Sequence, residues 1–143
     1  VVNSVGKAGG MALYWNNAET IEHLSHTDRY ILACITDKEV NSQWWLMCVH
    51  ARSSSNVRKG QWKHVAEWKK GWGEGWVMVG DFDDLLSNGE KWGGGVRAES
   101  SFKDFYSFIR DNELLDIGYK GLPRTWSNYW EGEGEVKERL DRG

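Results

Sequence analysis

The sequence predicts an α/β protein in which sheets are covered by helices. Runs rich in β-forming residues occur in both halves of the chain, two helical segments lie among them, and two early runs are close enough to form a hairpin. The expected order is strand, strand, strand, helix, strand, helix, strand, strand. This order is typical of an α/β (α+β) sandwich, here with an incomplete set of strands.

Three strands are expected before the first helix. The run GGMALYW at 9–15 is apolar and begins with a glycine pair. The runs at 29–36 and 44–51 are rich in β-formers and flank the polar turn DKEVNS. We therefore expect 29–51 to form a hairpin.

The segment 58–70 has helical periodicity, because Trp62 and Val65 fall on one face. Its other positions are strongly basic, which indicates a solvated face. A glycine-rich break follows, and the next run, WVMVGDF at 76–82, is apolar on both faces. Such a strand belongs in the middle of a sheet.

The second half begins with a glycine-rich loop at 87–100, which lacks the spacing of a P-loop or dinucleotide-binding motif. Aromatic residues then recur every three or four positions over 101–116, which predicts an amphipathic helix. We expect Ser101 to cap this helix and Gly118 to end it. Two short strands are expected after it, at 124–130 and 136–142.

Composition indicates one globular domain, since the 143 residues are 40% hydrophobic with a net charge of −3. This charge gives no sign of the basic face of most nucleic-acid binders, although it does not exclude an enzyme that reaches phosphates through a metal. Cys34 and Cys48 lie in apolar runs, and we see no signal peptide or membrane-spanning run. We therefore expect buried thiols in a reduced, intracellular protein.

Carboxylates follow the best-defined strand in the stretch GWVMVGDFDDLL. Asp81 and Asp83 stand at its carboxyl end, where ligands gather in layered α/β folds. Residues two apart on a strand point the same way, so both carboxylates face one point if the strand persists. Their hard oxygens suit Mg²⁺ or Mn²⁺. A turn or helix-capping role for Asp83 and Asp84 is the alternative.

Two other groups are site candidates. Arg139 and Asp141 in ERLDR alternate on an expected strand and would share a face, or form an ion pair on the sheet surface. Thr125 and Asn128 in RTWSN are small polar residues beside a strand, and turn chemistry explains them equally well.

The four histidines all lie in the first half of the chain. His23 and His26 are expected in a surface loop, and His64 on the solvated face of the first helix. His50 ends a strand, and it is the one histidine near a plausible site edge.

Together these motifs resemble the endonuclease/exonuclease/phosphatase superfamily. The segments that carry this resemblance are GWVMVGDFDDLLSNGEKWGG, the aromatic helix after it, LLDIGYKGLPRTWSN and RLDR. The sequence is most similar to the endonuclease-like domain of plant LINE-type non-LTR retrotransposons, which has a GDFN strand end, an EK-GG loop, an FTWSN segment and an RLDR strand. The resemblance covers nearly the whole chain and implies a DNase I-like four-layer α/β sandwich.

The resemblance also implies hydrolysis of DNA phosphodiesters assisted by Mg²⁺ or Mn²⁺. Asp81 matches the Asp of GDFN, which is implied to act on the attacking water. Asp83 matches the Asn of that motif, which donates hydrogen bonds to the phosphate. Asp141 matches the Asp of RLD, and His50 falls where the family has a Tyr near the phosphate. These four residues are the expected catalytic set.

The same comparison assigns the remaining expected site residues. Asp81 and Asp83 are the candidate metal ligands, without the Glu that the family uses as its main ligand. Arg139, Thr125 and Asn128 lie in the matching motifs and are expected to contact the substrate.

The departures from the family predict a partial domain over 1–143 that is inactive. A carboxylate at Asp83 has no N–H to donate. The N-terminal strands that carry the family's Asn and Glu, and the SDH segment that should follow RLDR, are not in the sequence. A domain without its edge strands is also expected to expose unpaired backbone.

Two other functions stay open. One is an active phosphoesterase on a phosphoinositide or sphingomyelin. The other is a non-catalytic binding module whose ten tryptophans form interfaces in place of core. The expected partners are DNA and other domains of a retrotransposon polyprotein, with no membrane.

Overall fold

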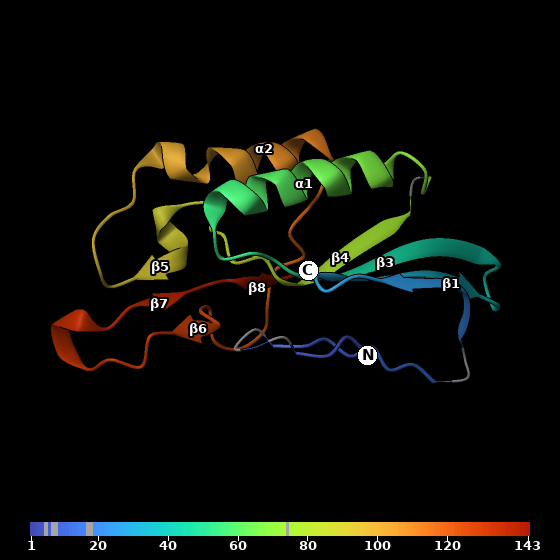
Figure 1. Ribbon diagram of the computed structural model, residues 1–143, viewed down its shortest axis with the longest axis horizontal. Coiled ribbons are helices and arrows are strands. Elements are labelled where there is room, and N and C mark those ends of the chain that lie inside the picture. Colours follow the sequence, from blue (N-terminus) through green and yellow to red (C-terminus); the bar gives the residue numbers. More distant parts are fainter. Residues whose placement is uncertain (5, 7–8, 17–18, 74) are drawn as a thin grey trace.

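A computed structural model describes residues 1–4, 6, 9–16, 19–73 and 75–143 of the chain. Its largest unit is a five-stranded sheet with the order β1-β2-β3-β4-β8. Two helices lie side by side over one face of this sheet, and the N-terminal segment runs across the other face (Figure 1). The predicted class is confirmed: the arrangement is α+β and compatible with an α/β sandwich.

The predicted hairpin is confirmed. β2 (Tyr30–Asp37) and β3 (Ser42–His50) pair in antiparallel register. Asn41 in the turn has a φ of 49°, and the carboxylate of Asp37 accepts the backbone N–H of Glu39 at 2.8 Å. These are the polar turn contacts that such a sequence favours.

Two predictions near the N-terminus are wrong. His23 and His26 lie in strand β1 (Glu19–His26), although their side chains are exposed as expected. The segment ETIEHLSH is polar because β1 is an edge strand of the sheet, so it lacks the apolar run that marks an interior strand. Conversely, the described part of 9–15 forms only an isolated bridge between Met11 and Val2.

Helices α1 (Ser55–Lys69) and α2 (Lys103–Asp111) cover the sheet. The second helix is shorter than the sequence predicts. Asn112 donates its side-chain N–H to the carbonyl of Phe108 at 2.8 Å, and Glu113 has a φ of 55°. This left-handed residue ends the helix five positions before Gly118. Ser101 caps nothing, since it lies inside the short 3₁₀ helix Glu99–Phe102.

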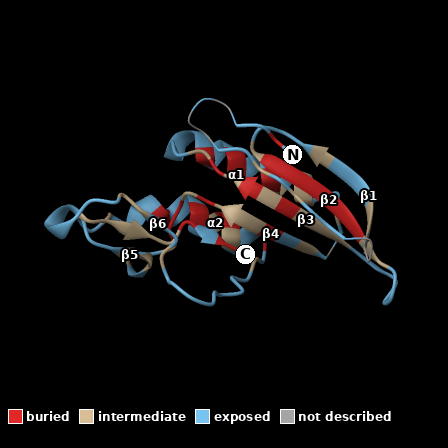
Figure 2. Cartoon of the chain, turned by 90° about the horizontal axis from the view of Figure 1, so that it is seen from below, coloured by how far each residue is buried: buried red, intermediate tan, exposed pale blue. Residues whose placement is uncertain are grey.

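The core lies between the two helices and the sheet (Figure 2). Trp62 of α1 stands at its centre, with ring centroids 4.9 to 5.8 Å from Phe82, Phe105 and Phe108. Trp62 and Val65 are both buried, as the helical periodicity predicts. Aromatic packing therefore joins α1, α2 and the end of β4.

β4 (Trp76–Asp81) is the interior strand that the sequence predicts. It pairs in parallel with β3 and, over two residues, antiparallel with β8 (Asp141–Arg142). Gly80 has a φ of 132°, and a Cβ there would overlap the carbonyl oxygen of Val49. Only glycine fits this close approach of β3 and β4.

A second, small sheet extends from the end of the first one (Figure 1). Its order is β5-β7-β6, with β5 at Lys91–Trp92, β6 at Trp126–Ser127 and β7 at Lys137–Glu138. The single strand expected at 136–142 is therefore two strands in different sheets. The chain changes sheet between Glu138 and Asp141.

Cys34 is buried, Cys48 is half-buried, and both are free thiols. Burial raises the pKa of each thiol above its ordinary value. None of the helices in the described parts of the chain has the length and apolar character needed to cross a membrane.

Candidate functional site

Three of the predicted catalytic residues stand next to one another across three strands. β3 and β4 run parallel and pair His50 with Asp81, and β4 and β8 run antiparallel and pair Asp81 with Asp141. Parallel strands bring their carboxyl ends to one edge of the sheet, and the β8 pairing adds a third residue there. We call His50, Asp81 and Asp141 the strand-end row.

Asp81 is the half-buried centre of this row. Its Oδ1 accepts the backbone N–H of Asp83 at 2.9 Å, and its carbonyl accepts the N–H of Ala51 at 2.8 Å. Burial raises the pKa of Asp81, and the negative charge of Asp141 raises it further. The N–H of Asp83 and the positive charges of His50 and Arg58 only partly oppose this shift.

Asp83 does not continue the strand. β4 ends at Asp81, and Asp83 has a φ of 47°, so the expectation that both carboxylates point from one face of a persistent strand is wrong. Asp83 instead lines an open hollow beside His50 and the start of α1. Burial raises its pKa, and Arg58 opposes that shift.

Asp84 forms a buried ion pair that sequence reasoning missed. Nε of Arg58 lies 3.0 Å from its Oδ2, and both side chains are at most 7% exposed. The same guanidinium donates to the carbonyls of Arg52 and Ser53 at 2.7 and 2.9 Å. The prediction that Arg58 lies on a solvated helix face is therefore wrong. Its position one turn before Trp62 on the same helix face is the signal that could have revealed it.

Arg139 falls between β7 and β8 and is bound by acids. Its Nη2 lies 2.8 Å from Asp116, and its Nη1 lies 3.6 Å from Glu90. Arg142 contacts the same two acids at 3.1 and 2.8 Å. This four-residue charge network joins the small sheet, the segment after α2 and β8.

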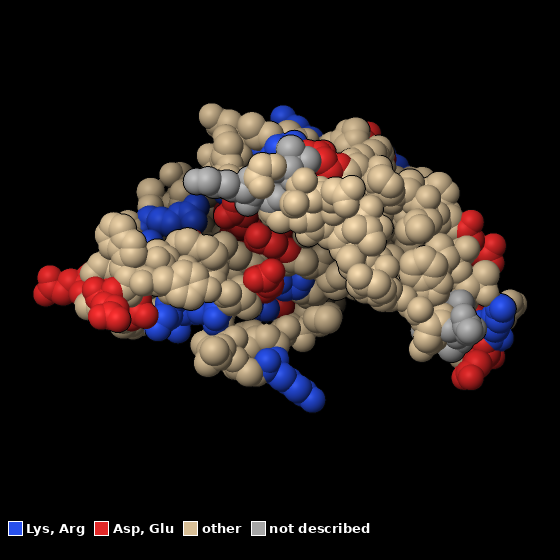
Figure 3. Space-filling model, turned by 60° about the horizontal axis from the view of Figure 1, so that its bottom comes forward, with Lys and Arg blue, Asp and Glu red and all other residues tan. Residues whose placement is uncertain are grey.

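The network changes the pKa of one of its acids. Burial alone raises the pKa of Asp116, but the hydrogen bonds from Arg139 and from the backbone of Gly118, with the charges of Arg139 and Arg142, lower it below its ordinary value. Acidic side chains gather in the middle of one molecular face, with basic ones beside them (Figure 3).

Thr125 and Asn128 make turn and backbone contacts. The hydroxyl of Thr125 accepts the N–H groups of Leu140 and Asp141 at 3.2 and 3.1 Å, which places the backbone of the third member of the strand-end row. Asn128 accepts the N–H of Val136 at 3.0 Å and holds the hairpin between β6 and β7. Thr125 is therefore adjacent to the row, and Asn128 belongs to the small sheet.

Few side chains of the site could act as ligands for a cation. Across the described ranges, no group of three or more His, Cys, Asp or Glu side chains could hold a metal ion. Mg²⁺ and Mn²⁺ bind mainly through several oxygen ligands. The residues present do not complete a site for the cation that the resemblance implies.

Comparison with known proteins gives structural likenesses without a sequence match. No family model matches the sequence, and no curated protein matches it. Among the solved structures that match is TDP2 of D. rerio complexed with a single-strand DNA product, with a TM-score of 0.49 and 15% sequence identity. The match covers 87% of this chain and 52% of the other, so the chain spans about half the length of that protein.

Proposed function

We propose that this chain is an endonuclease/exonuclease/phosphatase-like domain, of the plant LINE-type retrotransposon branch, that has lost phosphodiester hydrolysis. The observation that carries the proposal is the strand-end row. It assembles His50, Asp81 and Asp141 at the carboxyl end of β4, and the GDF and RLD motifs of the resemblance supply Asp81 and Asp141. In an active relative of this kind the Asp81 carboxylate would act on the attacking water.

Electrostatics support the loss of activity. The carboxylate of Asp83 stands beside the row, at the position where the family has an amide, and it has no N–H to donate to a phosphate. Arg58, the cation that most affects the pKa of Asp83, is held by Asp84 at 3.0 Å. Arg139 is likewise held by Asp116. Arg29 and Arg52 also line the hollow beside Asp83, and both are paired with Asp28, at 3.4 and 2.6 Å. An entering phosphate would therefore meet guanidinium groups that carboxylates already bind.

The incomplete donor set supports the same conclusion. Asp81 and Asp83 are the expected ligands for a cation, Asp141 stands beside Asp81, and Oδ1 of Asp81 already accepts a backbone N–H. No step of a reaction can be assigned through a metal on these residues. The chain keeps the carboxylates of a phosphodiesterase site, while the arginines described beside them are already paired with other acids.

Nicking of supercoiled plasmid in Mg²⁺ or Mn²⁺ tests this proposal. The chain and Asp81→Ala should both leave the plasmid intact. Metal-dependent nicking by the chain that Asp81→Ala abolishes would overturn it. A soluble inositol phosphate and an aryl phosphodiester, incubated in the same buffers, test for a phosphoesterase with a non-DNA substrate.

A matched pair of variants tests the electrostatic argument. Asp83→Asn restores the family's amide and should tighten binding of duplex DNA severalfold, measured by fluorescence anisotropy at low salt. Asp111→Asn removes one equal charge from an exposed position of α2 and should change affinity little. Equal effects of the two variants would show that only net charge matters.

The retrotransposon origin has a separate test in the genomic sequence. A reverse-transcriptase coding region in the same reading frame would support it. If no such coding region is found, the retrotransposon origin is removed from the proposal. The conclusions about the strand-end row would not change.

A second candidate, a non-catalytic binding module, rests on the exposed aromatic residues of the small sheet. Trp126, Tyr129 and Trp130 are 43%, 90% and 68% exposed. Three glutamates follow in the adjoining turn, which fits a protein partner better than DNA. Titration calorimetry with a reverse-transcriptase domain from the same reading frame tests this candidate. Binding that Trp130→Ala abolishes would favour it.

A further inference from the structure

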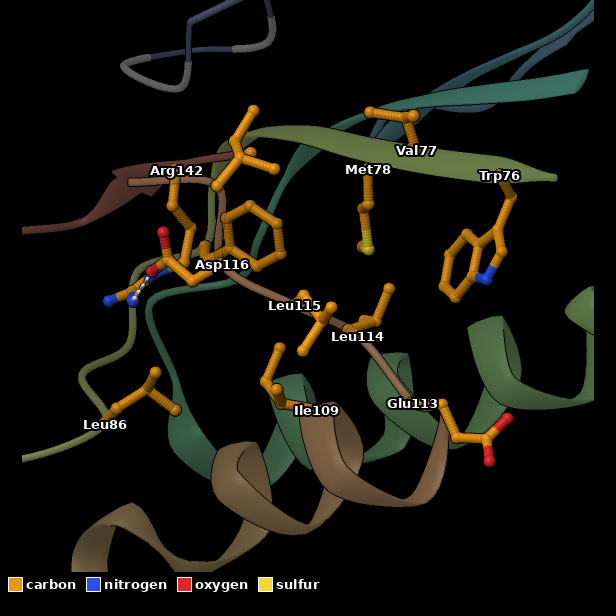
Figure 4. A pocket seen from close by; sticks show the side chains of 13 residues that line it. Trp76, Val77, Met78, Leu86, Ile109, Glu113, Leu114, Leu115, Asp116 and Arg142 are labelled. Atoms are coloured by element: carbon orange, nitrogen blue, oxygen red, sulfur yellow. Dashed lines mark hydrogen bonds and ion pairs between the residues drawn. The ribbon is translucent and has the colours of Figure 1, made fainter. Parts of the chain in front are cut away.

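Arg124 differs from the other arginines of the chain because its side chain has no acidic partner. Each of the others has a carboxylate oxygen at 3.9 Å or less. Arg142, for example, lies 3.1 Å from Asp116 (Figure 4). The guanidinium of Arg124 makes no hydrogen bond or ion pair with any described residue, and its Nε is buried. An unpaired guanidinium keeps its N–H donors for a ligand.

Arg124 lines a hollow of about 360 Å³ on the small sheet. The other lining residues lie in the segment before β6, in β6, in the turn after it and in β7. Trp126 and Tyr129 are two of them, and their side chains are 43% and 90% exposed. Open aromatic rings beside a cation suit a flat apolar group that carries a negative charge.

Two hydroxyl groups line the same hollow. The hydroxyl of Thr125 accepts the N–H groups of Leu140 and Asp141, and that of Ser127 accepts the N–H of Tyr129 at 3.0 Å. Neither hydroxyl donates a hydrogen bond to a described residue, so each keeps one hydrogen to donate. The free polar groups of the hollow are therefore mainly donors, which favours a ligand with acceptor oxygens.

The charge at the hollow suits a ligand with one negative charge. Lys137 also lines it, but its Nζ lies 2.6 Å from Glu135 and 5.4 Å from the centre of the Trp92 ring. The charge of Lys137 is therefore balanced within the protein, and Arg124 contributes one positive charge that no acid balances. The other glutamates of the adjoining turn disfavour a polyanion such as a nucleic-acid strand.

We propose that this hollow binds a small aromatic carboxylate, that is, a flat ring with one carboxylate group. The carboxylate accepts hydrogen bonds from the guanidinium of Arg124, whose planar fork matches two carboxylate oxygens. The ring of the ligand packs against Trp126 and Tyr129. The site uses neither a divalent metal nor the strand-end row.

NMR titration with naphthoate tests the proposal. Naphthoate should shift the Nε–H signal of Arg124 and the indole N–H signal of Trp126, and both shifts should saturate. Naphthalenemethanol has the same rings without the charge, and acetate has the charge without the rings. Each of these two controls should bind at least about tenfold more weakly than naphthoate.

A matched pair of arginine variants locates the site. Arg124→Gln should weaken naphthoate binding at least about tenfold, measured from the Trp126 indole signal. Arg110→Gln removes an equal charge from an exposed position of α2, where Arg110 is paired with Asp111, and should leave binding unchanged. Equal losses in the two variants, or equal binding of naphthoate and either control compound, would overturn the proposal.

A second pair of variants tests the aromatic contact. Tyr129→Ala should weaken naphthoate binding severalfold without lowering the melting temperature, because the side chain of Tyr129 is exposed. Tyr106→Ala, at a residue of α2 that is 56% exposed, should leave binding unchanged. Wild-type affinity in Tyr129→Ala would contradict the stacking of the ligand ring. None of these measurements uses DNA or a divalent metal, so their outcome is independent of whether the chain hydrolyses phosphodiesters.

Discussion

Asp83 places a carboxylate at a backbone position that favours an amide. Its φ of 47° lies in the left-handed region, which Asn enters at little cost, and burial raises its pKa. A carboxyl whose pKa is raised by folding holds its proton more tightly in the folded chain. Its contribution to the free energy of unfolding is therefore fully present below the pKa of the unfolded chain. That contribution is lost as the pH rises through the pKa of the folded chain.

Asp83→Asn should stabilise the chain at pH 7 by raising the melting temperature about 1 to 3 °C. The gain should shrink below the ordinary Asp pKa of 3.8, where the wild-type carboxyl is protonated in both states. Thermal melts from pH 3 to 8 measure it, with Asp111→Asn as the exposed control. A gain that does not depend on pH would assign the effect to backbone conformation alone.

Arg58 shows how one buried side chain can organise the site. It binds Asp84 and two carbonyls of the loop before α1, so it fixes the loop beside His50 to the turn after β4. Arg58→Met should destabilise the fold by about 3 to 5 kcal/mol, because the buried Asp84 carboxylate then keeps only Arg97, 3.9 Å away, and the N–H of Leu85. Urea denaturation measures this change.

The double variant Arg58→Met/Asp84→Leu should recover most of that loss, since no charge is then left unpaired. Lys59→Met, which breaks an ion pair that is 49% exposed, should cost less than about 0.5 kcal/mol. A double variant no more stable than the single one would show that the carbonyl contacts of Arg58 dominate.

At the scale of elements, helix α1 is the part that joins the layers. Trp62 touches β4 through Phe82 and α2 through Phe105 and Phe108. Such periodic apolar elements were predictable: α1, the β2–β3 hairpin and β4 all lie where the sequence places them. Strand β1 was not predictable, because its sequence is polar. The end of α2 was not predictable either, because it depends on Asn112 and Glu113, which carry no strong helix-stop signal.

Trp62→Ala should destabilise the chain by about 3 to 5 kcal/mol, because three aromatic rings lose their common contact. Trp130→Ala, at a residue 68% exposed, should cost less than about 0.5 kcal/mol. Chemical denaturation of both variants measures the difference. Similar losses would mean that the small sheet contributes to the main core.

At the scale of the whole molecule, the two sheets differ in how they are held. The five-stranded sheet packs on a large aromatic core, whereas the strands of the small sheet are two residues long, and the small sheet is tied to the main sheet by the Arg139 and Arg142 ion pairs. These ion pairs are largely buried, so the cost of removing their charges from water offsets much of their attraction, whereas buried apolar area stabilises directly.

Hydrogen exchange rates should therefore distinguish the small sheet from the five-stranded sheet. Amides of β6 and β7 should exchange at least about 100-fold faster than those of β2 and β3 under native conditions. Exchange measured by NMR over hours at pH 6 gives the comparison. Uniform protection of both sheets would show that they unfold as one unit.

The sequence by itself determined the class of the fold, its interior strands and the position of Asp81 after a core strand, because apolar periodicity and glycine depend on local geometry. Only the tertiary structure decided which charges meet. It placed His50, Asp81 and Asp141 in one row, bound Arg58 to Asp84, and divided the segment 136–142 between two sheets. Those contacts join residues far apart in the chain, and spacing along a sequence carries no signal for them.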